Sequence, residues 1–241
     1  MTQIKFPLVG VLLALVVVHT VSAGLASFFS QNSVKSATVV SCFGPKSTGK
    51  SGLLSEIYNR EGPASDSDDV NIFYDQSQKV VVIEADIDDG VPSESSLVAA
   101  GTSDVILFNV PVSALSRDGL SSLKPLLEEI CDSYAKGQVS LDSPKKLVLA
   151  IRDVDSSLEK TISDKIPVMV QELWDDLSRP LKAASLKFSE MFELVVAPLP
   201  SAAADAAGFR QYAAALGGLL AEAAPAAGDA GKRVKAREER A

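Results

Sequence analysis

Runs of apolar residues alternate along this chain with segments whose apolar residues recur every three or four positions. The runs predict five buried strands, over residues 38–43, 79–84, 104–110, 146–151 and 192–197. Runs that stay apolar without alternation are typical of strands covered on both faces, as in a parallel sheet.

The segments with helical spacing fall between these strands. We expect helices over residues 51–58, 95–100, 120–135 and 158–177, and a terminal helix within the Ala-rich residues 201–230. The long helix is expected to open with a capping box formed by Ser156 and Glu159, and Pro167 to kink it or interrupt its first half. The polar residues 59–78 predict a loop. The pattern indicates an α/β fold, a mostly parallel sheet with helices on both faces and ligands at the carboxyl ends of the strands.

The first 23 residues predict a secretory signal peptide, because Lys5 precedes the apolar residues 6–18 and Val21-Ser22-Ala23 fits a cleavage site. An uncleaved membrane anchor is the alternative, since the apolar segment could cross a bilayer core of about 30 Å. Both predict the secretory pathway or the endoplasmic reticulum, the second with membrane association through the N-terminus. Residues 24–37 form a linker or, in a third interpretation, a transit segment to an organelle.

Composition and charge exclude several classes of function. Acidic residues outnumber basic ones by 31 to 23, and the net charge of −8 argues against a nucleic-acid partner. We expect the two cysteines, Cys42 and Cys131, to be buried free thiols because they fall at apolar strand and helix positions. The one histidine, His19, lies in the N-terminal apolar segment. If that segment is removed, no imidazole is left for a catalytic triad or a zinc site.

A phosphate-binding motif joins the first predicted strand to the first predicted helix. Residues 44–51 fit the pattern G-x-x-x-x-G-K-[ST], and they follow a strand and precede a helix as that motif requires. Its glycines let backbone N–H groups surround a phosphate, Lys50 would reach the β- and γ-phosphates, and Ser51 would ligate Mg²⁺. The candidate nucleotide-binding residues of this segment are Gly44, Lys46, Ser47, Thr48, Gly49, Lys50, Ser51 and Gly52.

Several segments in a fixed order resemble the G domain of the atlastin and root-hair-defective branch of dynamin-like GTPases, which fuse endoplasmic reticulum tubules. The segments are GPKSTGKSGLL, SLVAAGTSDVILFNV, KPLLEEI, LVLAIRD, ELWDDLSRP and FELVVAPL. They are most similar to the plant and fungal root-hair-defective type. The resemblance implies a P-loop GTPase-like fold with GTP and Mg²⁺ as ligands and a possible homodimer across the nucleotide face. We assign the G domain to residues 38–222, and the composition predicts an Ala-rich and then charged flexible tail over 223–241.

The resemblance also implies how the base is recognised. Arg152 and Asp153 match the family's base-recognition pair, in which the aspartate accepts two hydrogen bonds from guanine. Adenine cannot supply these donors, and an unpaired buried carboxylate is costly, so Asp153 would select guanine. Residues 199–201 match the loop that covers the base.

The chain departs from the family where GTP is hydrolysed. The family's Asp-x-x-Gly corresponds to Glu84, Ala85, Asp86 and Ile87, so Glu84 would serve the metal while Ile87 replaces a glycine that approaches the γ-phosphate. The segment between Lys50 and Ile83 contains no threonine to serve as the switch residue. Ser47 stands where atlastins have an arginine. The family's helical bundle and transmembrane hairpin would begin where this chain stops, so membrane fusion is not expected from this chain alone.

These features leave three hypotheses open. The first is a GTP-binding domain with slow or absent hydrolysis. The second is an active GTPase with a rearranged switch, in which Glu84 and Asp86 act catalytically and an aspartate orients the attacking water. The third is a nucleotide-independent dimerisation or interaction domain.

Overall fold

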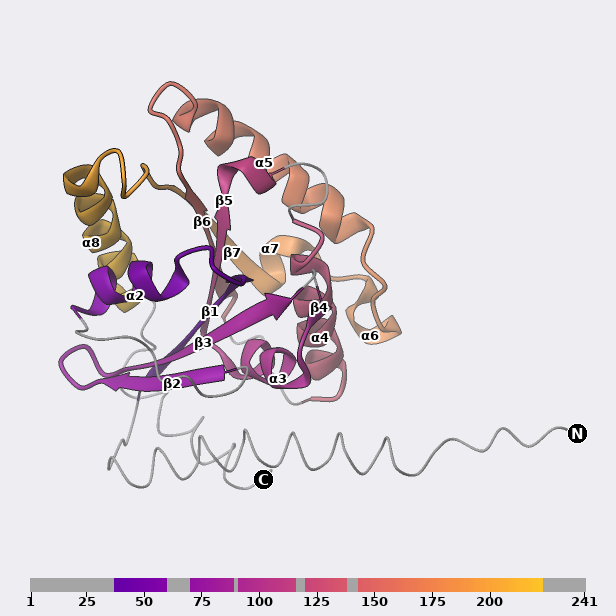
Figure 1. The fold of residues 1–241 in the computed structure, drawn as a ribbon. Coiled ribbons are helices and arrows are strands. Elements are labelled where there is room, and N and C mark those ends of the chain that lie inside the picture. Colours follow the sequence, from indigo (N-terminus) through magenta and orange to yellow (C-terminus); the bar gives the residue numbers. More distant parts are fainter. Residues whose placement is uncertain (1–36, 60–69, 89–90, 116–119, 138–142, 223–241) are drawn as a thin grey trace, which may run out of the picture.

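The computed structural model describes residues 37–59, 70–88, 91–115, 120–137 and 143–222 (Figure 1). The predicted signal peptide or anchor, nearly all of the linker or transit segment, and the tail from residue 223 lie outside the described residues. In the part of the chain that the structure describes, none of the helices has both the length and the apolar character that a membrane span requires.

A twisted sheet forms the centre of the described fold. Its strands follow the order β2-β3-β1-β5-β6-β7, and β4 pairs with β3 outside this path. The strands β1, β3, β5, β6 and β7 are parallel, whereas β2 and β4 run antiparallel to β3. Their bounds are β1 Thr38–Pro45, β2 Val70–Asp75, β3 Val80–Asp88, β4 Val91–Pro92, β5 Val105–Pro111, β6 Lys145–Arg152 and β7 Phe192–Pro198. The predicted mostly parallel sheet is confirmed.

Helices cover both faces of this sheet, as the sequence predicts. On one face lie α2 (Lys50–Tyr58) and α8 (Ala206–Glu222), which contact each other. The other face carries α3 (Glu94–Thr102), α4 (Leu123–Ala135) and α5 (Glu159–Asp175). The short elements are a 3₁₀ turn at Val112–Ala114, α6 (Leu181–Ala184) and α7 (Phe188–Met191). Each face has its own apolar cluster, so the central strands are buried on both sides.

The strand β1 illustrates why the central runs are apolar without alternation. Val39 and Phe43 belong to the cluster under α3, α4 and α5, whereas Val40 and Cys42 belong to the cluster under α2 and α8. Cys42 and Cys131 are buried free thiols, as predicted. Burial raises the pKa of both thiols above the usual value, to about 11 for Cys131.

The predicted loop over residues 59–78 is wrong in part, because β2 lies within it. This strand pairs antiparallel with β3 and forms the edge of the sheet. Its side chains are half-buried, with Ile72 and Tyr74 packed toward one cluster and Phe73 toward the other. The sequence did not indicate this six-residue strand, because polar residues flank it and its apolar side chains are divided between two faces.

Two other expectations are corrected. The strand β3 continues to Asp88, four residues past its predicted end, because it pairs with β1 as far as Ile87 and with β4 at Ile87 and Asp88. The helix α5 begins without a side-chain cap, so the predicted capping box is absent there, and the helix runs unbroken through Pro167. Just before it, hydrogen bonds from the Ser157 side chain and then from the Ser157 N–H lower the pKa of the Asp155 carboxylate.

Candidate nucleotide-binding site

The phosphate-binding segment forms a tight loop between β1 and α2, at the carboxyl edge of the parallel strands. Gly49 lies in the left-handed region with φ of 78° and directly precedes the helix. Ser47 also has a positive φ, 61°. Inside the loop, the Thr48 hydroxyl donates to the Pro45 carbonyl over 2.8 Å. The loop therefore leads into the N-terminus of α2, where backbone N–H groups can face an anion.

The neighbouring strand β5 contacts this loop through Asn109. The Asn109 side chain on β5 donates to the Thr48 carbonyl and hydroxyl, each over 3.1 Å. A Cβ atom on Gly44 would lie 2.1 Å from the Asn109 carbonyl oxygen, a distance that no real Cβ tolerates. Gly44 is thus required for the close packing of the loop against β5, independently of any ligand.

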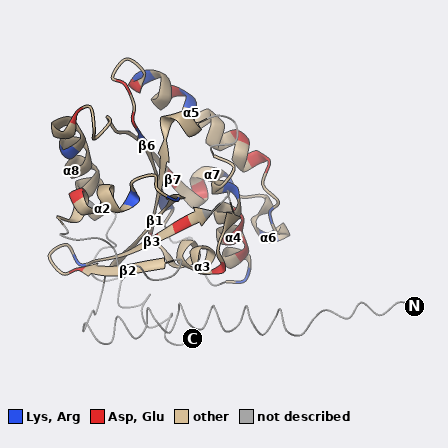
Figure 2. Ribbon diagram, in the orientation of Figure 1, with Lys and Arg blue, Asp and Glu red and all other residues tan. Residues whose placement is uncertain are grey.

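Lys50 is buried in the loop, with 3% of its surface exposed. Its ammonium group donates to the carbonyl oxygens of Gly44 at 3.0 Å and of Pro45 at 2.9 Å. It also forms an ion pair with Asp86 of β3, with 2.5 Å between Nζ and Oδ1. In Figure 2 the basic start of α2 lies near the acidic stretch of β3.

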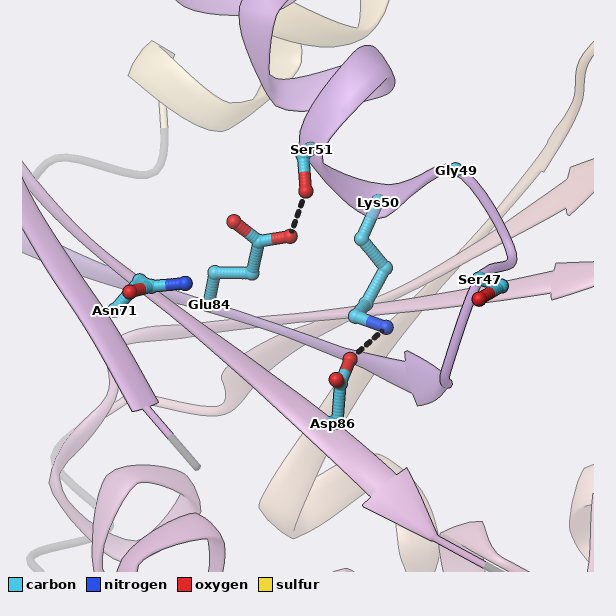
Figure 3. A pocket seen from close by; sticks show the side chains of 7 residues that line it. All are labelled: Ser47, Gly49, Lys50, Ser51, Asn71, Glu84 and Asp86. Atoms are coloured by element: carbon cyan, nitrogen blue, oxygen red, sulfur yellow. Dashed lines mark hydrogen bonds and ion pairs between the residues drawn. The ribbon is translucent and has the colours of Figure 1, made fainter. Parts of the chain in front are cut away.

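Beside this ion pair lies an open cavity of about 400 Å³. Figure 3 shows Glu84 and Asp86 extending from β3 toward Ser51 and Lys50. The Ser51 hydroxyl donates to Glu84 Oε1 over 2.6 Å, and the Glu84 side chain is nearly buried. The lining residues are Ser47, Gly49, Lys50, Ser51, Asn71, Glu84 and Asp86.

The Ser51–Glu84 pair has the chemistry of a magnesium site. A hydroxyl oxygen and a carboxylate are hard oxygen ligands, and a Mg²⁺ site of this kind takes only one or two protein ligands beside phosphate and water. The Ser51 hydroxyl can donate to Glu84 and still offer a lone pair to a metal ion. Among the described residues, no group of three or more His, Cys, Asp or Glu side chains is arranged to hold a metal.

Asp153 lies just past β6, exposed and with φ of 61°. The segment after β7 is joined to it, because the Leu199 N–H donates to Ile151 and the Val154 N–H donates to Leu199, over 2.7 and 2.9 Å. The residues predicted to recognise the base and those predicted to cover it thus lie side by side. Both segments lie at the carboxyl ends of the parallel strands, as does the phosphate-binding loop.

Arg152 points toward the phosphate-binding loop. One guanidinium nitrogen donates to the carbonyl oxygens of Thr48 at 3.2 Å and Gly49 at 3.0 Å. The guanidinium also lies over the ring of Phe209 in α8, 4.8 Å from its centroid. Arg152 therefore links the loop, β6 and the terminal helix.

The other predicted residues of the loop are on the surface, and three further residues at or near the site were not predicted. Lys46, Gly52 and Ser47 are exposed, and Ser47 lines the cavity. Sequence reasoning missed Asn71, Asn109 and Phe209. Asn109 had a usable signal, since it is the one polar residue in the run VILFNV. Asn71 could not be found without first recognising β2, where it is paired with Glu84.

The chain is similar in sequence to several curated proteins. No protein-family model matches the chain. It is 24% identical over 189 residues to Protein SEY1 of Meyerozyma guilliermondii, covering 65% of this chain and 22% of that protein. It is 27% identical over 192 residues to Protein ROOT HAIR DEFECTIVE 3 homolog 1 of Oryza sativa, covering 69% of this chain and 21% of that protein. The chain is similar to the SEY1 and ROOT HAIR DEFECTIVE 3 proteins.

The resemblance predicted from the sequence is therefore confirmed. A further rice relative, Protein ROOT HAIR DEFECTIVE 3, is 25% identical over 224 residues, or 82% of this chain and 27% of that protein. The chain thus spans about a quarter of the length of these curated relatives. Among solved structures, a GTP-binding protein from Sulfolobus solfataricus in complex with GDP aligns with 16% identity and a TM-score of 0.39, over 82% of this chain and 57% of that chain. A likeness at that level establishes neither fold nor function.

Proposed function

We propose that this chain is a guanine-nucleotide-binding G domain that hydrolyses GTP slowly or not at all. The observation that carries the proposal is the placement of Lys50 and Ser51 at the start of α2. Lys50 Nζ is held over the loop by the Gly44 and Pro45 carbonyls, and the Ser51 hydroxyl meets Glu84 at 2.6 Å. A loop of this form binds phosphates through its N–H groups and the lysine. Ser51 and Glu84 would hold Mg²⁺, which neutralises phosphate charge when bound.

The position of Asp153 supports guanine as the base. Its carboxylate is exposed at the carboxyl end of β6, and Arg152 beside it reaches the phosphate-binding loop. An aspartate there can accept hydrogen bonds from both N1–H and the 2-amino group of guanine. The relationship to the SEY1 and ROOT HAIR DEFECTIVE 3 proteins supports the same assignment.

Slow hydrolysis is supported by the groups that surround the Ser51–Glu84 pair. Phosphoryl transfer depends on positioning the nucleophile and on stabilising the charge that develops. No threonine lies between Lys50 and Ile83 to position a water molecule. Ile87, which stands where the resemblance places a glycine, has its side chain buried in the core. The backbone there is part of the paired end of β3.

Nucleotide binding and phosphate release by the 241-residue chain test this proposal. We expect Mg²⁺-dependent binding of a fluorescent GTP analogue, with phosphate release no faster than about one per hour, because the charge-stabilising groups are incomplete. Lys50→Ala should weaken binding by about a hundredfold, since it removes the ammonium group from the loop. Lys160→Ala, on the surface of α5, is the matched control.

Each outcome bears on a different element of the proposal. Rapid phosphate release that Lys50→Ala abolishes would replace it with an active GTPase. A folded protein that binds no guanine nucleotide would leave the interaction-domain hypothesis. ATP competing as well as GTP would contradict the role given to Asp153.

A further inference from the structure

All three N–H donors of the Lys50 ammonium group have an acceptor in this structure. Lysine offers three N–H donors, and three acceptors surround Nζ: the Gly44 carbonyl at 3.0 Å, the Pro45 carbonyl at 2.9 Å and Asp86 Oδ1 at 2.5 Å. A phosphate oxygen can therefore accept a hydrogen bond from Lys50 only by displacing one of these acceptors.

Asp86 is the acceptor that a phosphate must displace. The two carbonyls belong to the last residues of β1, which are paired with Asp86 and Ile87 of β3 and cannot move without opening the sheet. The Asp86 carboxylate instead ends a side chain that is 37% exposed and lines the cavity. It stands where a phosphate oxygen would meet Lys50, and it carries the same sign of charge.

The backbone of Asp86 holds this carboxylate close to the site. Asp86 lies opposite Gly44, and the next residue, Ile87, is buried and paired with both β1 and β4. The side chain can rotate away from Lys50, but its Cα stays beside the phosphate-binding loop. Asp86 therefore remains a nearby negative charge after a nucleotide has bound.

The terminal phosphate of a nucleoside triphosphate would meet this charge most directly. Lysine and metal ion in such a loop both act on the last two phosphates of a triphosphate. Here Glu84, which faces Ser51, and Asp86, which faces Lys50, are two residues apart on one face of β3. The third phosphate would have to enter beside both of these carboxylates. A diphosphate lacks that group and carries one negative charge fewer.

We propose that Asp86 is a specificity-determining residue that makes this site bind a nucleoside diphosphate in preference to the triphosphate. The inference rests on the proposed function, because it requires that the loop binds guanine nucleotides. Repulsion between like charges and the competition for Lys50 both act against the triphosphate.

Paired titrations of the full chain with fluorescent GDP and with a non-hydrolysable fluorescent GTP analogue, in the same Mg²⁺ buffer, test this inference. We expect the wild-type chain to bind the diphosphate about tenfold more tightly. Asp86→Asn keeps the size of the side chain but removes its charge, so it should tighten triphosphate binding by about tenfold and change diphosphate binding much less. Asp164→Asn, an exposed position on α5, is the charge-matched control and should leave the ratio unchanged.

The outcomes separate this inference from the proposed function. Equal affinity of the wild-type chain for the two nucleotides would overturn the role of Asp86 and leave guanine-nucleotide binding intact. The same holds if Asp86→Asn, shown to be folded by circular dichroism, changes both affinities by one factor. Binding of neither nucleotide by the folded wild-type chain would overturn both. If the variant does not fold, equal affinity of the wild-type chain for the two nucleotides still overturns the inference.

Discussion

Gly44 shows how much of the phosphate-binding loop is determined by contacts within the protein. Its Cα faces the Asn109 carbonyl so closely that a side chain has no room. The motif in the sequence requires a glycine at this position, and the structure adds a reason that needs no ligand. The neighbouring strand and the loop must be in contact before the loop can take its shape.

Gly44→Ala should therefore destabilise the protein even without nucleotide. The new methyl group would overlap the Asn109 carbonyl, and overpacking of this kind typically costs about 1–3 kcal/mol. Thermal or urea unfolding measures the change. Gly218→Ala on the exposed side of α8, where a Cβ meets nothing within 4 Å, should instead stabilise by about 0.5–1 kcal/mol. Equal stability of Gly44→Ala and the wild type would show that the loop is looser than described.

Sequence reasoning at this scale found the residues but not their contacts. Residues 44–51 were identifiable because the motif is local, and their chemistry follows from residue type. The ion pair between Lys50 and Asp86 could not be predicted, because it depends on the register that places Asp86 opposite Gly44. That register is set by the pairing of β3 with β1, two strands that are far apart in the sequence.

At the scale of elements, Arg152 connects three of them. It leaves the end of β6, donates to two carbonyls of the phosphate-binding loop and stacks on Phe209 of α8. The planar guanidinium can make these contacts together, whereas a lysine ammonium has neither the fork nor the flat face. The geometry gives Arg152 a role in positioning the loop.

Arg152→Lys tests this positioning role against direct contact with the base. We expect GTP and GDP binding to weaken by a similar factor, roughly tenfold, because the loop loses support that both nucleotides need. The preference for guanine over adenine should stay the same. Competition titrations with GTP, GDP and ATP measure both effects, and Arg210→Lys on the exposed side of α8 is the matched control. A changed base preference would show that Arg152 contacts the base.

The elements that were predicted well are those with long apolar patterns. The central strands and the helices α4 and α5 follow directly from such patterns, with bounds shifted by a few residues. The strand β2 was missed because an edge strand needs only a half-buried face, and its partner β3 supplies the hydrogen bonds. With β2 unrecognised, Asn71 could not be placed in the site either.

At the scale of the whole molecule, each of the two apolar clusters encloses one of the two thiols. Cys42 lies in β1 under α2 and α8, and Cys131 lies in α4 on the opposite face. Neither thiol can ionise readily while the two helical layers stay in place, because burial raises both pKa values. Their titration therefore reports on the integrity of the whole fold.

The free energy of unfolding should fall as the pH rises from about 9 toward 11. In the unfolded chain a thiol ionises near 9.0, whereas Cys131 in the folded protein holds its proton up to a pKa of about 11. The unfolded state thus binds fewer protons in this range, and stability decreases with pH. Urea unfolding at several pH values measures the slope, which Cys131→Ala should reduce. Thiol labelling of the native protein at pH 8 as fast as in urea would contradict the burial of both cysteines.

The ion pair between Lys50 and Asp86 also bears on whether the protein needs nucleotide in order to fold. A buried ammonium group without a counter-charge would disfavour the folded chain until an anion arrived. Here β3 supplies the counter-charge as soon as the sheet forms, so Asp86 compensates the Lys50 charge within the protein itself. We expect the chain to fold to its native state even at low nucleotide concentration.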